Sequence, residues 1–310
     1  MHSTSKDPAG TNQAPIVVAG ATGQLGARIV RALRQHGAPV RALVRPGTTA
    51  EARQSLRDQG VHIVEVDYDN GSDLAAACAG AGCVVSALSG LREVIVAAQT
   101  RLLEAAVAAG VPRFIPSDYS ADFTKLPVGA NRNFDLRREF GERLDRAPIA
   151  ATSILNGMFA DLLTGQAPVV LFGPKRIVFW GNADQPLDFT TMDDTAAYTA
   201  WAALDPATPR YLRIAGEVAS PRQLQTAASQ ATGEQFRLTR VGGLGLLQGM
   251  IKVTRFLVPG RKEVFPPWQG MQYLHNMLSG QAKLSPLDND RYPEMRWTPV
   301  REVLTTRVAG

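Results

Sequence analysis

Three glycines spaced three residues apart stand out near the start of the chain, in the run Gly20-Ala21-Thr22-Gly23-Gln24-Leu25-Gly26. Glycine allows tight turns and close approach of a bound group, and backbone N–H groups at a helix start attract anions. Here Gly20 would make the turn, Gly23 would admit a pyrophosphate, and Gly26 would bring a helix against a strand. We therefore predict that residues 20–26 bind a dinucleotide cofactor; a glycine turn that binds nothing is the alternative.

The elements around this loop are those that such a site requires. Residues 15–19 are apolar and rich in β-branched side chains, which is typical of a buried strand. Residues 25–36 have a helical pattern that ends at Gly37, and residues 40–44 form a second apolar run. A glycine loop between a strand and a helix is much stronger evidence for a dinucleotide site than the glycines alone.

Arg45 follows the second strand, where an NAD site commonly carries an acidic residue for the ribose hydroxyls. A guanidinium instead offers a planar fork of donors that suits a phosphate. We therefore predict NADP(H) as the cofactor. An arginine that is merely solvated at a strand end is the alternative.

The alternation of strands and helices continues to about residue 160. Strands are expected at 61–66, 82–86, 113–116 and 149–155, and helices at 48–59, 72–79, 91–109 and 131–146. This order predicts an α/β fold with a Rossmann-type, doubly wound parallel sheet. Ligands of such sheets lie beyond the carboxyl ends of the strands. Further cofactor contacts are therefore expected from the residues that end or follow these strands: Asp67, Ser86, Ser117 and Asn156.

The pattern loosens after residue 160. We expect a β-hairpin from 169–172 and 176–180, strands at 211–214 and 236–240, and helices at 192–204, 221–231, 244–257 and 268–279. The predicted organisation is a disordered arm at 1–13, an NADP-binding domain at 14–160 and a smaller α+β substrate lobe at 161–310. Segments such as 175–204 are free to pack back on the first domain.

Composition narrows the class of protein. The chain has 310 residues, 45% of them hydrophobic, and a net charge of +5. Residues 205–310 carry 14 basic and 8 acidic side chains, without a long basic run, which suits an anionic ligand better than nucleic acid. The two cysteines and four histidines have no metal-ligand spacing. We expect a cytoplasmic protein with a small-molecule substrate, no metal, and neither nucleic acid nor membrane as partner; its oligomeric state stays open.

Several stretches resemble the NmrA-like and isoflavone-reductase-like branch of the atypical short-chain dehydrogenases. They are the glycine loop 20–26, Leu43-Val44-Arg45, Val66-Asp67, residues 114–119 (Phe-Ile-Pro-Ser-Asp-Tyr) and residues 153–159. The resemblance covers about residues 14–165. It implies NADPH along the strand ends and a substrate cleft against the C-terminal lobe. It further implies either hydride transfer to a phenylpropanoid-like or other aromatic substrate, or regulation without turnover.

The catalytic residue departs from the pattern of this branch. Ordinary short-chain dehydrogenases use a Tyr with Lys four residues on, but Tyr119 has Phe123 at that offset. Isoflavone-reductase-like members carry a Lys on the following helix, and Arg137 aligns with that place. Arginine stays protonated, so it polarises an oxygen but donates a proton poorly. Tyr119, with a lowered pKa near a nicotinamide, is therefore the predicted proton donor.

Each catalytic candidate has an alternative. Lys125 is a further candidate if its loop folds inward, and an exposed loop residue otherwise. Arg137 could form a surface ion pair with a neighbouring carboxylate, and Tyr119 could pack beside the cofactor.

Two functions follow. The first is an NADPH-dependent reductase that transfers a hydride to a small carbonyl or aromatic substrate, phenylpropanoid- or quinone-like. The second is a non-catalytic, NADP(H)-binding regulatory protein. An apolar pocket lined by Phe265, Trp268, Tyr273 and Met277 would favour the reductase.

Overall fold

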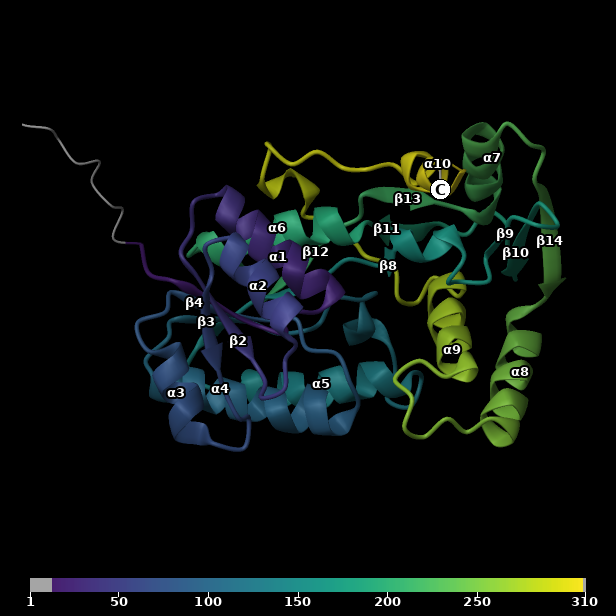
Figure 1. Cartoon of the computed structure of the whole chain (residues 1–310). Helices are drawn as coiled ribbons and strands as arrows, with labels where there is room; N and C mark the ends of the chain where they lie inside the picture. Colours follow the sequence, from purple (N-terminus) through teal and green to yellow (C-terminus); the bar gives the residue numbers. More distant parts are fainter. Residues whose placement is uncertain (1–12, 309–310) are drawn as a thin grey trace, which may run out of the picture.

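The structure, a computed structural model, describes residues 13–308, so nearly all of the arm predicted at 1–13 lies outside the described residues (Figure 1). A six-stranded parallel sheet in the order β3-β2-β1-β4-β5-β6 forms its centre. The strands are β1 (Ile16–Ala19), β2 (Val40–Val44), β3 (His62–Glu65), β4 (Cys83–Ser86), β5 (Arg113–Ile115) and β6 (Ala150–Ala151). The predicted α/β, Rossmann-like sheet is confirmed, and β1 lies at its middle, paired with β2 and β4.

Helices cover both faces of this sheet, which is why its strands are apolar on both sides. One face packs against α1 (Gln24–Gln35) and α6 (Met192–Leu204), through Ile29, Leu33 and Ala196. The other packs against α3 (Gly71–Cys78), α4 (Gln99–Ala108) and α5 (Arg132–Leu144). A π-helix at Glu93–Ala98 precedes α4, and α2 (Ala50–Asp58) lies outside β3. Figure 1 shows the two layers above and below the strands.

The predicted strand at 149–155 is broken at Thr152. Its first half, β6, pairs with β5, and its second half, β7 (Ser153–Leu155), pairs with β12 (Tyr211–Arg213). The Thr152 N–H donates to the Phe114 carbonyl, whereas the Ser153 N–H donates to the Arg210 carbonyl, so the pairing partner changes between these two residues. The strand predicted at 211–214 is therefore β12, which forms a separate two-stranded sheet with β7 next to this edge.

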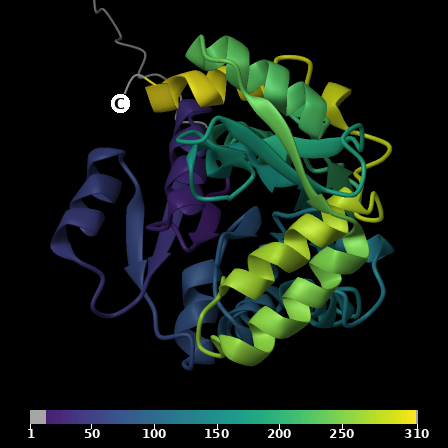
Figure 2. The same ribbon diagram turned by 90° about the vertical axis from the view of Figure 1, so that its right-hand side faces the viewer.

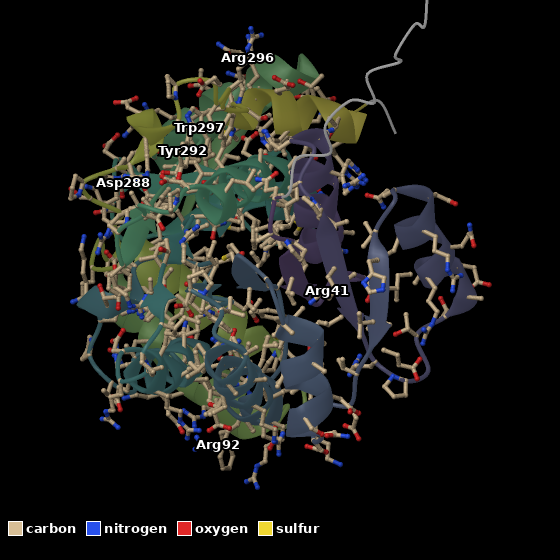
Figure 3. All side chains as sticks on the ribbon, turned by 90° about the vertical axis from the view of Figure 1, so that its left-hand side faces the viewer. Arg41, Arg92, Asp288, Tyr292, Arg296 and Trp297 are labelled. Atoms are coloured by element: carbon tan, nitrogen blue, oxygen red, sulfur yellow. The ribbon has the colours of Figure 1, made fainter. Side chains whose placement is uncertain are left out.

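Helix α6 belongs to the layer over the sheet, and the last part of the chain holds it there. The segment after residue 287 returns across α6, where the Tyr198 ring lies 5.0 Å from Tyr292 and 5.9 Å from Trp297 (Figure 3). The Tyr198 hydroxyl also donates to the Asp288 carbonyl at 2.8 Å. Part of the chain after residue 160 is thereby built into the sheet domain.

The remaining elements form two small sheets and a group of helices. One sheet, β14-β10-β9, contains the predicted hairpin, and the other is β13-β11-β8. The strands are β8 (Met158–Phe159), β9 (Val170–Leu171), β10 (Arg176–Trp180), β11 (Leu187–Thr190), β13 (Glu217–Ala219) and β14 (Arg237–Gly242). The helices are α7 (Pro221–Thr232), α8 (Leu244–Leu257), α9 (Pro267–Leu278) and α10 (Val300–Val308). Figure 2 shows α8 and α9 side by side at the edge of the molecule.

Candidate active site at the strand ends

The glycine loop is built around two contacts that leave no room for a side chain. Gly20 has φ +78, and a Cβ on it would lie 2.6 Å from the Ala87 carbonyl oxygen. A Cβ on Gly26 would lie 2.0 Å from the Gly20 carbonyl oxygen. The loop after β1 is thus held between the end of β4 and the first turn of α1.

Gly23 has a different role. It is the N-cap of α1 in an ordinary extended conformation, φ −78 and ψ 166, and no side chain in the described residues caps the helix there. Thr22, Gly23 and Gln24 are exposed, and the first turn contains no acidic residue. The first-turn N–H groups and the positive end of the helix dipole therefore face open space, as an anion site requires.

Arg45 lies one strand away from this loop. Its carbonyl accepts hydrogen bonds from the Thr48 N–H and hydroxyl at 3.1 and 2.8 Å, which shape the turn before α2. The side chain is exposed and forms no ion pair within residues 13–308, because the nearby carboxylate of Glu65 pairs with Arg53. The guanidinium is therefore available to a phosphate.

The other predicted cofactor residues divide into two groups. Asp67 and Ser117 are already engaged: the Asp67 carboxylate accepts from the Asp69 N–H at 2.9 Å, and the Ser117 hydroxyl donates to the Leu88 carbonyl at 2.7 Å. Ser86 and Asn156 are fully buried, and their side-chain polar atoms have no hydrogen-bond partner among the described residues. Buried polar atoms left without partners are unusual; Ser86 ends β4 of the six-stranded sheet, and Asn156 follows β7 of the adjoining two-stranded sheet. They fit a polar ligand at the strand ends, as a dinucleotide would be.

The structure places Tyr119 in the interior of the protein. Its side chain is buried in the core that α6 shares with the sheet, beside Ile115 and Ile154. Burial raises the pKa of the phenol far above its usual value, and the Thr199 hydroxyl on α6 offsets this only in part. The role of Tyr119 as proton donor beside a nicotinamide stays a prediction. The side chain lies against α6, a helix more than seventy residues further along the chain that covers this face of the strand end.

Lys125 is anchored by the C-terminal part of the chain. Its ammonium donates to the carbonyls of Lys283 and Ser285, at 2.8 and 3.3 Å, and lies 3.4 Å from the Asp122 carboxylate. Asp122 is fully buried and also accepts from Arg213 at 2.8 Å. These contacts give Lys125 a structural task, which is to fasten the loop after β5 to residues 283–285.

Arg137 turns inward from α5. Its neighbours on the helix are paired elsewhere, Asp135 with Arg138 and Glu139 with Arg92 and Arg143. Arg137 forms no ion pair in the part of the chain that the structure describes. One guanidinium nitrogen donates to the Asn133 carbonyl at 3.1 Å, and its Nε is buried without a partner. The surface ion pair considered for it is not the observed arrangement.

The charge of Arg137 acts on Asp118, which belongs to the stretch 117–119 that follows a strand and for which the sequence predicted no separate role. This carboxyl is buried; one oxygen accepts from the Ser153 hydroxyl at 2.6 Å and the other has no partner among the described residues. Burial raises the pKa of Asp118, and the Ser153 hydroxyl and the charge of Arg137 oppose the rise. Its position three residues after the end of β5, at the strand ends, was the available signal.

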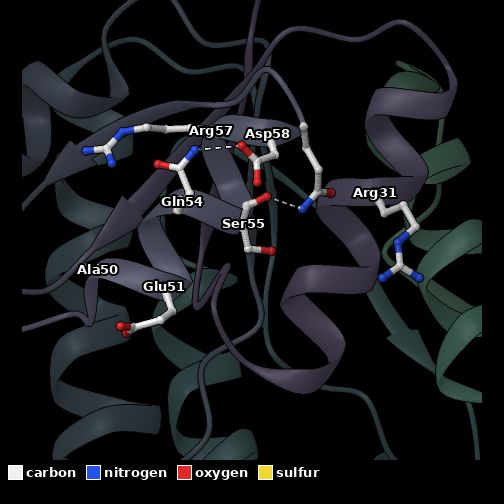
Figure 4. A pocket seen from close by; sticks show the side chains of 8 residues that line it. Arg31, Ala50, Glu51, Gln54, Ser55, Arg57 and Asp58 are labelled. Atoms are coloured by element: carbon white, nitrogen blue, oxygen red, sulfur yellow. Dashed lines mark hydrogen bonds between the residues drawn. The ribbon is translucent and has the colours of Figure 1, made fainter.

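Two hollows of the structure lie away from these residues. An open groove of about 890 Å³ runs along α2 and includes Arg31 of α1, with polar residues such as Gln54 and Asp58 at its walls (Figure 4). A small, apolar, nearly closed cavity lies between Met158, Phe189 and helix α9. Of the four residues expected to line an apolar pocket, only Met277 borders this cavity, whereas Trp268 is buried and donates to the Pro259 carbonyl.

Within residues 13–308, no group of three metal-binding side chains is close enough to hold an ion, and no helix is both long and apolar enough to cross a membrane.

Known proteins resemble this chain over most of its length. Pinoresinol reductase 1 of Arabidopsis thaliana is 30% identical over 76% of this chain and 80% of that protein. A bifunctional pinoresinol-lariciresinol reductase of Linum usitatissimum is 25% identical over 93% of this chain and 97% of that protein. The solved structure of AtPrR2 with NADP+ and (+)pinoresinol has a TM-score of 0.81 and 25% identity, and the match covers 96% of this chain and 99% of that chain. The sequence pattern of the NmrA-like family matches residues 12–259, and the chain belongs to that family.

Proposed function

We propose that this protein is an NADPH-dependent reductase that transfers a hydride to a small carbonyl or aromatic substrate of phenylpropanoid or quinone type. The observation that carries the proposal is an open helix start at Gly23 with, one strand apart, the guanidinium of Arg45, which forms no ion pair within residues 13–308. The first suits a pyrophosphate and the second suits a ribose phosphate. The similar protein solved with NADP+ and (+)pinoresinol supports both the cofactor and an aromatic substrate.

In this proposal the loop 20–26 holds the pyrophosphate and Arg45 the additional phosphate. Ser86 and Asn156, whose side-chain polar atoms have no partner in the described part of the chain, lie along the strand ends. When bound, NADPH would supply a hydride for an electrophilic carbon of the substrate. Negative charge then develops on the substrate oxygen or ring, and this charge must be stabilised and neutralised by a proton.

Arg137 is the residue that we assign to that charge. Its Nε is a buried donor without a partner in the described residues, so it is free to donate to an oxygen without breaking another hydrogen bond. The positive charge of Arg137 also acts on the buried Asp118 carboxyl, where it opposes part of the rise in pKa that burial causes. Arginine does not release its proton at neutral pH, so the proton that completes the product comes from water. Neither Tyr119, which is buried, nor Lys125, which is anchored, is suited to deliver it.

One observation favours a second function, that of a dinucleotide-binding regulator. Arg137 stands where the reductases of the resembled branch carry a lysine, so the proton donor expected of an enzyme is missing from its usual place. A regulator needs only the cofactor site.

Two measurements on the purified protein separate the two functions. Calorimetric titration with NADPH and NADH measures binding, and the loss of NADPH absorbance measures turnover against lignans, flavonoids and quinones. A Gly23→Val protein is the matched control, which should neither bind NADPH nor oxidise it. Binding together with turnover of one class supports the reductase, binding without turnover across the panel supports the regulator, and an absence of binding contradicts both.

A further inference from the structure

Large exposed apolar side chains gather in one segment of the surface. Phe256 and Leu257, at the end of α8, are 85% and 68% exposed, and they are accompanied by Leu246, Val253 and Phe265. We call these five residues the α8 patch. Helix α8 lies at the outer edge of the molecule, with α9 on its inner side (Figures 1 and 2). A contiguous apolar patch on a folded protein commonly marks an interaction site.

Helical periodicity shows that α8 has two apolar faces. Leu247 and Ile251 are buried and face the rest of the protein. Leu246, Val253 and Leu257 recur at the spacing of a second face that points outward, with Phe256 at its margin. Burial of the first face accounts for the packing of α8 on the rest of the protein. It does not explain why the exposed face is apolar as well.

Basic side chains border the patch. Lys252 and Arg255 form the polar strip of α8 beside Phe256, and Arg261 and Lys262 follow in the next loop; all four are exposed. Arg255 lies over the Trp268 ring at 5.1 Å, which keeps this part of the strip beside α9. Between residues 244 and 262 the chain contains no acidic residue.

The positive charge beside the α8 patch distinguishes between two possible partners, a second copy of this chain and an anionic membrane surface. A second copy docked through the same patch would bring two such basic strips into one interface, and like charges in an interface are costly. A surface of anionic lipid headgroups meets the same side chains with opposite charge. An apolar helix face flanked by Lys and Arg is the arrangement of a helix that lies in the membrane interface.

We propose that the α8 patch docks on anionic membrane surfaces, with Phe256 and Leu257 entering the headgroup boundary and the basic strip contacting lipid phosphates. The sequence predicted no membrane partner, because that expectation rested on the length of apolar stretches. A helix that lies on a bilayer needs no spanning length.

Co-sedimentation with vesicles tests the proposal. The full-length protein is mixed with vesicles of phosphatidylcholine alone or with added phosphatidylserine. We expect binding to the phosphatidylserine vesicles, weakened by salt, and little binding to phosphatidylcholine alone. Phe256→Ser with Leu257→Ser should weaken binding about tenfold or more, and Lys252→Glu with Lys262→Glu should weaken it at least as much. Val128→Ser, at an exposed apolar residue elsewhere, is the matched control and should bind as the wild type does.

Melting temperature and NADPH affinity, measured for each variant, establish that the protein is folded. Failure of the folded wild type to bind phosphatidylserine vesicles overturns the proposal, and so does equal binding by the serine double variant. A dimer in light scattering that the serine variant dissociates, without vesicle binding by the wild type, would assign the patch to a second copy instead.

Discussion

The first turn of α1 rests directly on the loop after β1, because a Cβ on Gly26 would lie 2.0 Å from the Gly20 carbonyl oxygen. Gly23, between these two residues, is not restricted in this way: its Cβ would meet only that same oxygen, at 3.3 Å, and the residue is exposed. The three glycines of one motif therefore serve two purposes. Gly20 and Gly26 shape the loop, and Gly23 keeps its outer side free.

Substitution of Gly26 should therefore mainly weaken folding, and substitution of Gly23 should mainly abolish cofactor binding. Gly26→Ala forces a methyl group against backbone and should lower the free energy of unfolding by about 1–3 kcal/mol or more. Gly23→Val should cost about 1 kcal/mol, as an unfavourable N-cap, but should abolish NADPH binding by blocking the helix start. Chemical denaturation and calorimetric titration measure the two effects, and unchanged NADPH affinity in Gly23→Val would assign that glycine to structure alone.

Arg45 should determine the choice between the two nicotinamide cofactors. We expect NADPH to bind more tightly than NADH by roughly 1.5–3 kcal/mol, the range for charge-assisted hydrogen bonds. Arg45→Ala should remove most of this preference and leave NADH affinity almost unchanged. Arg57→Ala, at an exposed arginine of α2, is the control. Equal affinities of the wild-type protein for both cofactors would contradict the prediction.

The buried carboxylate of Asp122 should make stability depend on pH. Burial disfavours its charged form, but the Thr124 hydroxyl and the Arg213 guanidinium outweigh burial, and the pKa of Asp122 is lowered. Stabilisation by a carboxylate with a lowered pKa is fully present above the unfolded-state pKa of about 3.9 and is lost as the pH falls through the folded value. Asp122→Asn should therefore cost about 1–3 kcal/mol at neutral pH, and the difference from wild type should shrink below about pH 4.

Unfolding by urea at several pH values measures that difference. Asp184→Asn is the control, because Asp184 pairs with Arg222 at the surface and should change stability little. If the free energies of unfolding of wild type and Asp122→Asn differ as much at low pH as at neutral pH, the stabilisation comes from packing and not from the charge of Asp122.

Much of the sheet domain could be predicted because its signals are local. The glycines between residues 20 and 37 and the apolar runs on either side of them predict β1, α1 and β2 within thirty residues of sequence. The strands β8, β11 and β13 could not be predicted in the same way. They have two to four residues each, and their pairing partners, such as Met158 for Phe189, lie far apart in the chain.

The direction of a side chain at the strand ends was also beyond local reasoning. Tyr119 points into the core because α6 returns over that face, and Lys125 is anchored by carbonyls of residues 283 and 285. Arg137 turns inward because the carboxylates beside it are taken by other arginines. The sequence showed which residues follow strands, but long-range packing decides which of them face a ligand.

Tyr119→Phe tests whether Tyr119 donates a proton to the substrate or only packs in the core. If the phenol were the proton donor, its removal would cut turnover by about 10²–10⁴. Because burial raises the pKa of Tyr119 and places it in the core, we expect turnover and NADPH affinity close to those of the wild type. Steady-state kinetics on any substrate that the panel identifies decide the matter, and a large loss of kcat with unchanged NADPH affinity would restore Tyr119 as the acid.

Arg137 is the residue on which the catalytic assignment depends. If its guanidinium stabilises the charge that develops on the substrate, Arg137→Ala should lower kcat by about 10²–10³, the usual effect of removing one such donor. NADPH affinity should stay the same, because the glycine loop and Arg45 are untouched. Arg143→Ala, on the exposed side of the same helix, is the matched control.

Arg137→Lys should keep the charge and add a group able to release a proton, so turnover should equal or exceed that of the wild type. NADPH oxidation by the four proteins, with the substrate panel, measures these effects. Turnover that Arg137→Ala leaves unchanged would remove Arg137 from the chemistry, and an absence of turnover in both the wild type and Arg137→Lys would favour the regulatory function.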